Sequence, residues 1–159
     1  MVFMRIAIVK LSALGDIVHA MIILQLIKKY HKTTSIDWFV EENYKELLEH
    51  HPAINKVHII NLKKAKYKKS IFLFFKELRR VRQLGCYDLV IDMQGLIKSA
   101  IVSKIIPSGM TIGFDRFSSR EGFSALFYNK RLNYGYEKNV IERNIALVEF
   151  AIGLHVNVQ

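Results

Sequence analysis

The chain has 159 residues, 51% of them hydrophobic, and carries a net charge of +10 at pH 7. A chain of this length and apolar content is expected to form one globular domain, and it is too apolar for a disordered protein. Its apolar stretches are too short to cross a bilayer, no signal peptide is expected, and the single cysteine, Cys86, excludes an internal disulfide framework. These features predict a cytoplasmic protein.

Most of the positive charge lies in one short segment. Between residues 63 and 82 the only carboxylate is Glu77, against nine basic side chains: Lys63, Lys64, Lys66, Lys68, Lys69, Lys76, Arg79, Arg80 and Arg82. Such a patch attracts polyanions, whether nucleic acid, an anionic membrane or a phosphorylated substrate. A solvated helix face with surplus lysines has the same composition, so charge alone does not choose among these readings.

In the first half of the chain, apolar runs alternate with helical periodicity. Strands are predicted at residues 6–9, 35–40 and 57–61, and helices at about 17–30, 43–50 and 70–84. The last of these helices has apolar residues at helical spacing and basic residues on its other face. We therefore expect its apolar face to be buried against the sheet.

The second half continues the alternation. Strands are predicted at residues 89–91 and 110–113 with an edge strand at 131–133, and helices at 96–106, 122–128 and 139–153. Strands that alternate with helices predict an α/β fold, a Rossmann-like, doubly wound and mostly parallel sheet with right-handed crossovers. We expect a single domain over residues 1–159.

The loop after the first strand is the first candidate site. Lys10, Ser12, Gly15 and Asp16 lie between a buried strand and a helix, where α/β proteins usually bind ligands. Gly15 would allow a sharp turn or a close approach of a ligand, and Asp16 would lie at the helix N-cap or in its first turn. An Asp in this place is often only a cap. The loop is neither a Walker A motif nor a Gly-x-Gly-x-x-Gly motif.

A second loop has the same layout. Asp92, Gln94 and Gly95 follow a buried strand and precede a helix that carries Lys98. In a parallel sheet both loops emerge at the carboxyl edge of their strands. We therefore expect the two loops to face one crevice, although polar loops after strands are common.

These motifs resemble a known family. The segments MRIAIVKLSALGDIVH (residues 4–19) and YDLVIDMQGLIKSA (residues 87–100) are similar to the lipopolysaccharide heptosyltransferases of glycosyltransferase family 9. Shorter similarities follow at residues 38–42, 51–54, 119–121, 125–130 and 140–143. The likeness is greatest to the type I branch, which adds the first heptose to the inner core.

The resemblance implies a fold and a reaction. The family has a GT-B fold of two Rossmann-like domains, and this chain corresponds to the amino-terminal, acceptor-binding half, without the half that binds ADP-heptose. The family reaction is an inverting transfer of heptose from ADP-heptose to Kdo of Kdo-lipid A, with no metal or other cofactor expected. Asp16 matches the proposed general base, because an acceptor hydroxyl must lose its proton as it attacks. The isolated half is expected to be inactive.

The resemblance also assigns binding residues. Lys63, Lys64, Arg120 and Arg143 match basic positions near the anionic acceptor, and the candidates of the two loops join them: Lys10, Ser12, Gly15, Gln94, Gly95 and Lys98. The remaining lysines of the basic segment are expected to face the cytoplasmic leaflet of the inner membrane, which would make the protein peripheral there. For Arg143, an ion pair with Glu142 or Glu149 on its own helix is the alternative.

Two other functions remain open. One is a basic nucleic-acid-binding module, because Tyr67, Phe72, Phe74 and Phe75 lie among the lysines. We expect these aromatic side chains to be buried and not to stack on bases, and no nucleic-acid motif is present. The other is a type II heptosyltransferase that uses a different acceptor.

Overall fold

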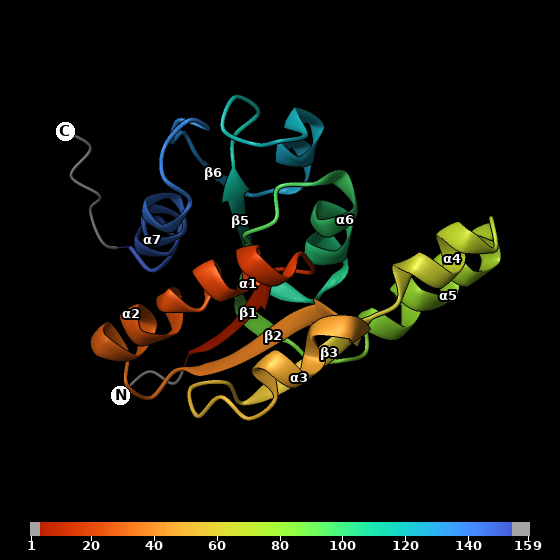
Figure 1. Cartoon of the computed structure of the whole chain (residues 1–159), viewed down its shortest axis with the longest axis horizontal. Helices are drawn as coiled ribbons and strands as arrows, with labels where there is room; N and C mark the ends of the chain where they lie inside the picture. The colour runs from red at the N-terminus through yellow and green to blue at the C-terminus, as the bar shows by residue number, and fades with distance from the viewer. Residues whose placement is uncertain (1–3, 154–159) are drawn as a thin grey trace.

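The computed structural model describes residues 4–153 and contains one six-stranded sheet in the order β3-β2-β1-β4-β5-β6 (Figure 1). The strands are β1 (Arg5–Val9), β2 (Ser35–Glu41), β3 (Lys56–Ile60), β4 (Tyr87–Asp92), β5 (Ser108–Phe114) and β6 (Lys130–Leu132). All five neighbouring pairs are parallel. The predicted parallel sheet is confirmed, with 131–133 as an edge strand shifted by one residue.

The helices cover both faces of this sheet. The α-helices are α1 (Leu14–Ala20), α2 (Ile22–Tyr30), α3 (Lys45–Leu48), α4 (Leu62–Tyr67), α5 (Ile71–Val81), α6 (Ile97–Ile105) and α7 (Val140–Ala151), and the 3-10 helices are η1 (Glu42–Tyr44) and η2 (Gly122–Phe127). One core packs Ile8 and Trp38 against α1, α2 and α7, and the other packs Val9 and Phe39 against α6 and the end of α5. The fold is therefore the predicted doubly wound α/β fold. In the described residues no helix is long and apolar enough to span a bilayer.

The helix expected at 17–30 is two helices. It begins earlier, at Leu14, and is divided at Met21, whose amide donates to the carbonyls of both Ile17 and Val18. The tighter i→i−3 bonding at this point turns the chain between α1 and α2. Helix α4 has no counterpart in the prediction, because its six residues include three lysines and bury only Ala65, which leaves no apolar period to detect.

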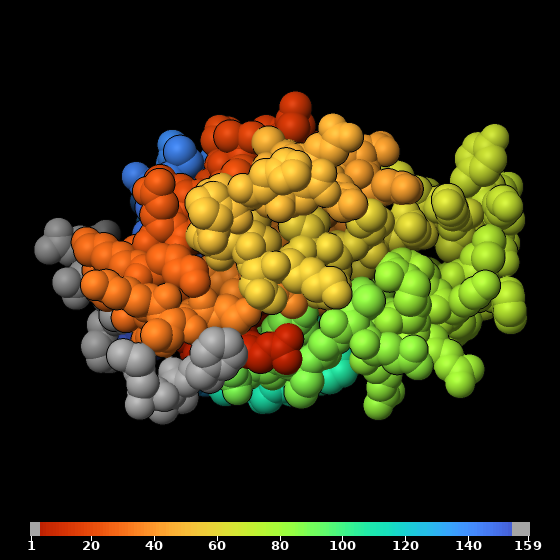
Figure 2. All heavy atoms as spheres, turned by 90° about the horizontal axis from the view of Figure 1, so that it is seen from below, coloured from red at the N-terminus to blue at the C-terminus, as the bar shows by residue number. Residues whose placement is uncertain are grey.

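The helix expected at 70–84 is shorter and is not buried as predicted. Ser70 caps α5, its hydroxyl accepting from the amide of Leu73 at 3.2 Å, and the helix ends at Val81 before Gly85. Toward its C-terminal end Leu78 and Val81 are buried, but large apolar side chains near its N-terminus are exposed. The reason is that α4 and α5 form a hairpin that extends beyond the sheet, as Figures 1 and 2 show. We call this pair of helices the α4–α5 hairpin.

A buried carboxylate shapes the loop between β4 and α6. Asp92 is fully buried and accepts hydrogen bonds from the amides of Gln94 (2.9 Å) and Gly95 (3.3 Å) and from the hydroxyls of Ser99 (3.0 Å) and Tyr128 (2.5 Å). Burial raises the pKa of Asp92, against the effect of these four donors. The loop between β4 and α6 therefore folds around one acceptor, the Asp92 carboxylate.

The two glycines of the candidate loops differ in what they require. Gly95 has φ +70°, a conformation that L side chains rarely adopt. Gly15 lies in the first turn of α1, has no positive φ, and a Cβ there would meet nothing within 4 Å. The expected special turn at Gly15 is thus wrong, since this residue is helical.

A second buried carboxylate ties three strands together on the α5–α6 side of the sheet. Asp37 accepts from Asn55 Nδ2 (2.9 Å) and from the Tyr87 hydroxyl (2.6 Å), and its Oδ2 lies 3.0 Å from His58 Nε2. Burial opposes ionisation, but the hydrogen bonds from His58, Tyr87 and Asn55 outweigh it and hold the pKa of Asp37 below its ordinary value.

Substitution of the two glycines should separate conformational strain from packing. Gly95→Ala should lower the free energy of unfolding by about 1–2 kcal/mol, because alanine must adopt a left-handed conformation there. Gly15→Ala should leave stability unchanged or raise it by up to about 1 kcal/mol, since alanine favours the helix. Urea titration of both variants measures this, and equal effects would contradict it.

Replacement of Asp37 should make the free energy of unfolding depend less on pH in the acid range. Asp37→Asn places an amide among donors and should cost about 1–3 kcal/mol at pH 7. A depressed folded pKa stabilises above the unfolded pKa of about 3.9, and this contribution is lost as the pH falls through the folded pKa. The difference between wild type and variant, followed by urea unfolding, should therefore shrink below about pH 4. A difference that stays constant with pH would show that Asp37 is not ionised in the native state.

Candidate functional site

A polar cavity of about 150 Å³ opens at the carboxyl edge of the sheet. Its walls come from the ends of β1, β4 and β5, the start of α1 and α7, and the loop after β5. It is lined by Lys10, Asp16, Met93, Gln94, Gly95, Leu96, Phe114, Ser119, Arg120, Tyr136, Val140, Arg143 and Asn144. The expectation that the two candidate loops face one crevice is confirmed by this shared lining.

Asp16 enters the cavity from the third position of α1 and is exposed. The N-cap of this helix is Ala13, so Asp16 is not the cap. Among the described residues the Asp16 carboxylate accepts no hydrogen bond and forms no ion pair. A carboxylate that lies at the N-terminus of a helix and has no protein partner can accept a proton or a hydrogen bond from a ligand.

Lys10 lies beneath Asp16 at the end of β1. Its side chain is buried and its Nζ donates to the carbonyl of Met93 at 3.4 Å. Burial lowers the pKa of Lys10, while the charges of Asp16 and Asp92 act in the opposite direction. Lys10 is thus a nearly solvent-free side chain on which the charges of Asp16 and Asp92 act without an ion pair among the described residues.

Gln94 links the two loops. Its Oε1 accepts from the backbone amide of Ser12 at 3.3 Å, which joins the end of β1 to the loop after β4. Ser12 and Gly15 do not line the cavity, although both border residues that do. The residue after Arg120, Glu121, ties its loop to α6: its carboxylate accepts from the amide of Ile97, the first residue of α6, at 2.7 Å.

The two arginines of the cavity have different environments. Arg143 is buried, and its guanidinium donates to the carbonyls of Tyr134 (2.7 Å), Gly135 (2.7 Å) and Ser118 (2.5 Å). Neither proposed partner on α7, Glu142 or Glu149, pairs with it in the part of the chain described; the three carbonyls take up its donors instead. Arg143 therefore joins the loop that follows β5 to the segment that follows β6.

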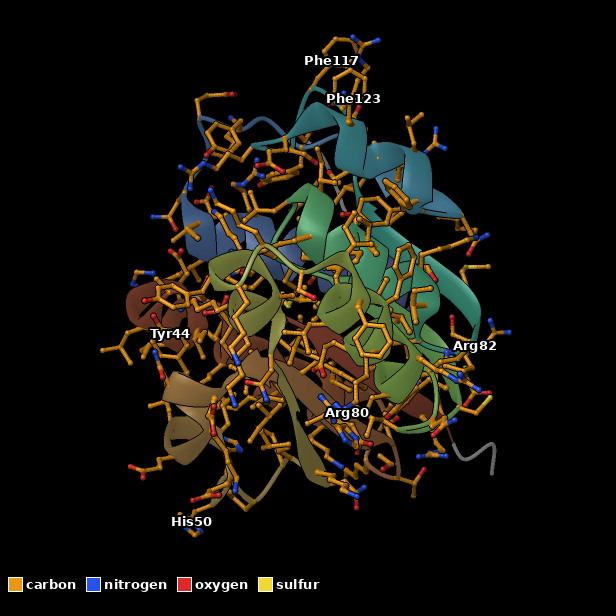
Figure 3. All side chains as sticks on the ribbon, turned by 90° about the vertical axis from the view of Figure 1, so that its right-hand side faces the viewer. Tyr44, His50, Arg80, Arg82, Phe117 and Phe123 are labelled. Carbon is orange, nitrogen blue, oxygen red and sulfur yellow. The ribbon has the colours of Figure 1, made fainter. Side chains whose placement is uncertain are left out.

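Arg120 is exposed on that same loop, and within residues 4–153 its guanidinium has no hydrogen-bond or ion-pair partner. Phe117 of the loop and Phe123 of the following helix η2 project away from the body and line a separate hollow of about 410 Å³ (Figure 3). The loop thus presents an unpaired cation to the cavity and aromatic rings to the outside.

Lys63 and Lys98 lie outside this cavity, in a larger groove of about 530 Å³ that runs from Glu41 along the α4–α5 hairpin to Ile71. Both bind Glu41, the last residue of β2: Lys98 Nζ donates to Oε1 at 3.0 Å, and Lys63 Nζ lies 2.6 Å from Oε2. The hydrogen bond to Glu41 raises the pKa of Lys63. Two further lysines, Lys66 and Lys69, line the groove.

Lys64 does not accompany Lys63, contrary to the expectation that the two act together. It lines a different hollow, together with Glu77 and Arg80. Successive residues of a helix are about 100° apart, so adjacent lysines on α4 face different directions.

Sequence reasoning missed Glu41 and the structural role of Asp92. Both are the last residue of a buried strand, and this shared position is the signal that could have found them. In the described residues no group of three or more His, Cys, Asp or Glu side chains is placed to hold a metal ion.

Comparison with known proteins gives a consistent result. The family model of glycosyltransferase family 9 (heptosyltransferase) matches residues 71–159. Lipopolysaccharide heptosyltransferase 1 of Campylobacter coli is 43% identical over 149 residues, and that of Escherichia coli K12 is 31% identical over 153 residues; each match covers 94% of this chain. The chain covers 42% and 48% of these relatives, so it spans about half their length.

A solved structure agrees with this likeness. E. coli heptosyltransferase WaaC with ADP-2-deoxy-2-fluoro heptose superposes with a TM-score of 0.87 at 28% identity, over 98% of this chain and 51% of WaaC. The family match covers more than half of the chain, and the fold agrees throughout. The chain belongs to glycosyltransferase family 9, the heptosyltransferases.

Proposed function

We propose that residues 1–159 form the acceptor-binding half of an inverting heptosyltransferase that transfers heptose from ADP-heptose to Kdo of Kdo-lipid A. The observation that carries this proposal is the free carboxylate of Asp16 in a cavity that also contains Lys10 and Arg120. The names of the relatives favour the type I acceptor over a type II acceptor, and the fluorinated ADP-heptose bound to WaaC supports a nucleotide-sugar donor.

Asp16 would act as the general base. A sugar hydroxyl is a poor nucleophile until its proton is being removed, and a carboxylate within hydrogen-bond reach supplies that function. Attack on the anomeric carbon in one step inverts that carbon and releases ADP. No metal or other cofactor takes part in this proposal, because a carboxylate base and nearby cations suffice for it.

The cations would bind the anionic acceptor. Arg120 is unpaired within the described residues and can contact the Kdo carboxylate directly, whereas Arg143 supports the loop of Arg120 through the carbonyl of Ser118. The groove of Lys63 and Lys98 offers two ammonium groups to a phosphate of the same acceptor, which would take the place of the Glu41 carboxylate. Lys64, which faces another hollow, has no part in this contact.

A lipid acceptor requires the protein to approach a membrane. We place the protein at the cytoplasmic face of the inner membrane, held there by the basic segment. Each basic residue near an anionic surface contributes on the order of 1 kcal/mol, and salt screens this attraction.

Removal of the proposed base should abolish transfer without loss of the fold. The test uses a polypeptide in which residues 1–159 are joined to the second half of the C. coli relative. In it, Asp16→Asn should lower kcat by roughly 10²–10⁴-fold, with little change in the KM for acceptor. The matched control is Glu142→Gln, an exposed carboxylate at the same position of the first turn of α7. Equal losses in both variants, or near-normal turnover of Asp16→Asn, would remove Asp16 from the proposed role.

Residues 1–159 alone should fold but transfer no heptose. Transfer requires donor and acceptor to be held in attack geometry, and the proposal gives the donor to a second half. Circular dichroism would report folding, and release of ADP from ADP-heptose in the presence of a deacylated acceptor would report transfer. Turnover by this polypeptide alone would refute the division into halves.

A further inference from the structure

We propose that the tip of the α4–α5 hairpin inserts into the interfacial layer of an anionic bilayer. The tip is defined by Tyr67, Ile71, Phe72 and Phe75. This inference deepens the membrane contact proposed above and rests on it: charge brings the protein to the lipid, and apolar insertion adds a contact that salt does not screen.

The tip is a cluster of exposed apolar side chains. Tyr67 is 90% exposed, Phe72 75%, Ile71 74% and Phe75 61%. Single exposed apolar residues are ordinary on protein surfaces, but four of them between residues 67 and 75, at the end of a projecting hairpin, indicate an interaction site. This is the face that the sequence analysis expected to be buried.

Cations surround the patch. Lys66, Lys68, Lys69 and Lys76 are exposed around it. The nearest carboxylate in the sequence is Glu77, which is already bound to Arg80 and to the amide of Asn61. Among the described residues, therefore, nothing neutralises the lysines of the tip. Aromatic and aliphatic side chains beside lysines are typical of helices that lie at an anionic membrane surface.

The order of residues along α5 fits insertion by its N-terminal end. Phe72, Phe75, Lys76 and Arg79 are three or four residues apart and share one side of the helix. The apolar members lie toward the tip and the cationic members toward the body of the protein. With the tip in the interface, the cations reach the level of the lipid phosphates.

The backbone of the tip is suited to a medium poor in water. The amide of Lys68 donates to Lys64, that of Lys69 to Lys66, and that of Ser70 to Ala65, and the Ser70 hydroxyl caps α5. These amides lose little when water is removed, because their acceptors lie within the hairpin. The hairpin also projects from the molecule, so it can reach a flat surface before other parts do (Figures 1 and 2).

These features favour a bilayer over nucleic acid. Base stacking requires aromatic faces, and Ile71, an exposed member of the tip, offers none. The groove of Lys63 and Lys98, whose lining reaches Ile71 of the tip, would then open beside the lipid surface from which the acceptor is drawn.

The test measures binding of the 159-residue chain to vesicles of phosphatidylethanolamine and phosphatidylglycerol by co-sedimentation. About 0.5 M salt reduces the Debye length to a few ångströms and should weaken but not abolish binding of the wild type. Phe72→Ser with Phe75→Ser should weaken the salt-resistant binding roughly tenfold or more. The control Tyr30→Ser, an exposed aromatic at the end of α2 far from the hairpin, should change nothing.

A second measurement reports insertion directly. The only tryptophan, Trp38, is fully buried, so Phe72→Trp adds a reporter at the tip. Its emission should shift to the blue on vesicles and be quenched by brominated acyl chains, whereas wild-type emission should not change.

The outcomes separate the claims. Binding that 0.5 M salt abolishes and the double serine variant does not alter would overturn insertion and leave the electrostatic contact of the proposed function. Absence of vesicle binding, with transfer to a deacylated acceptor intact in the joined polypeptide, would overturn both membrane claims but not the reaction. Binding of a single-stranded oligonucleotide that competes with vesicles and requires Phe72 would assign the tip to nucleic acid instead.

Discussion

The carboxylate of Asp92 is the interaction on which the candidate site depends. A buried carboxylate is costly unless it is fully hydrogen-bonded, so its four donors must keep their places. Two donors are amides of the loop after β4, and the others are Ser99 on α6 and Tyr128 after η2. The wall that carries Gln94 is thereby built around one acceptor. The opposite wall meets it through the contact from Ser12 to Gln94.

Much of the fold and of this cavity could be predicted from local patterns. Buried parallel strands have continuous apolar runs, and their polar ends necessarily meet at one edge of the sheet. Asp16 and Gln94 are brought together for this reason, although they are far apart in the sequence. Their chemical roles did not follow from spacing; those came from a likeness to known enzymes and remain proposals.

The basic segment shows where local patterns are insufficient. Helical periodicity shows that α5 has an apolar face but not how far the sheet beneath it extends, and Ile71, on that face, lies beyond the sheet and is exposed. Likewise, the adjacency of Lys63 and Lys64 predicted a shared contact, whereas the helix α4 turns them apart. The sequence allowed Arg143 either to bind the acceptor or to pair with a glutamate of its own helix. In the structure its guanidinium donates to three backbone carbonyls, and no pattern of side chains in the sequence predicts such a contact.

Glu41 gives the lysine groove a counterion of its own. Lys63 and Lys98 already form ion pairs with its carboxylate, so both long side chains are held in place before a ligand binds. Binding of a ligand then does not have to offset the loss of their rotamer entropy. The same ion pairs also limit which anions can replace the Glu41 carboxylate. A tethered carboxylate is present at a high effective concentration, so a small monovalent anion from solution competes poorly with it. An anion of higher charge that bridges both ammonium groups can take its place, and the groove is thereby selective for charge density.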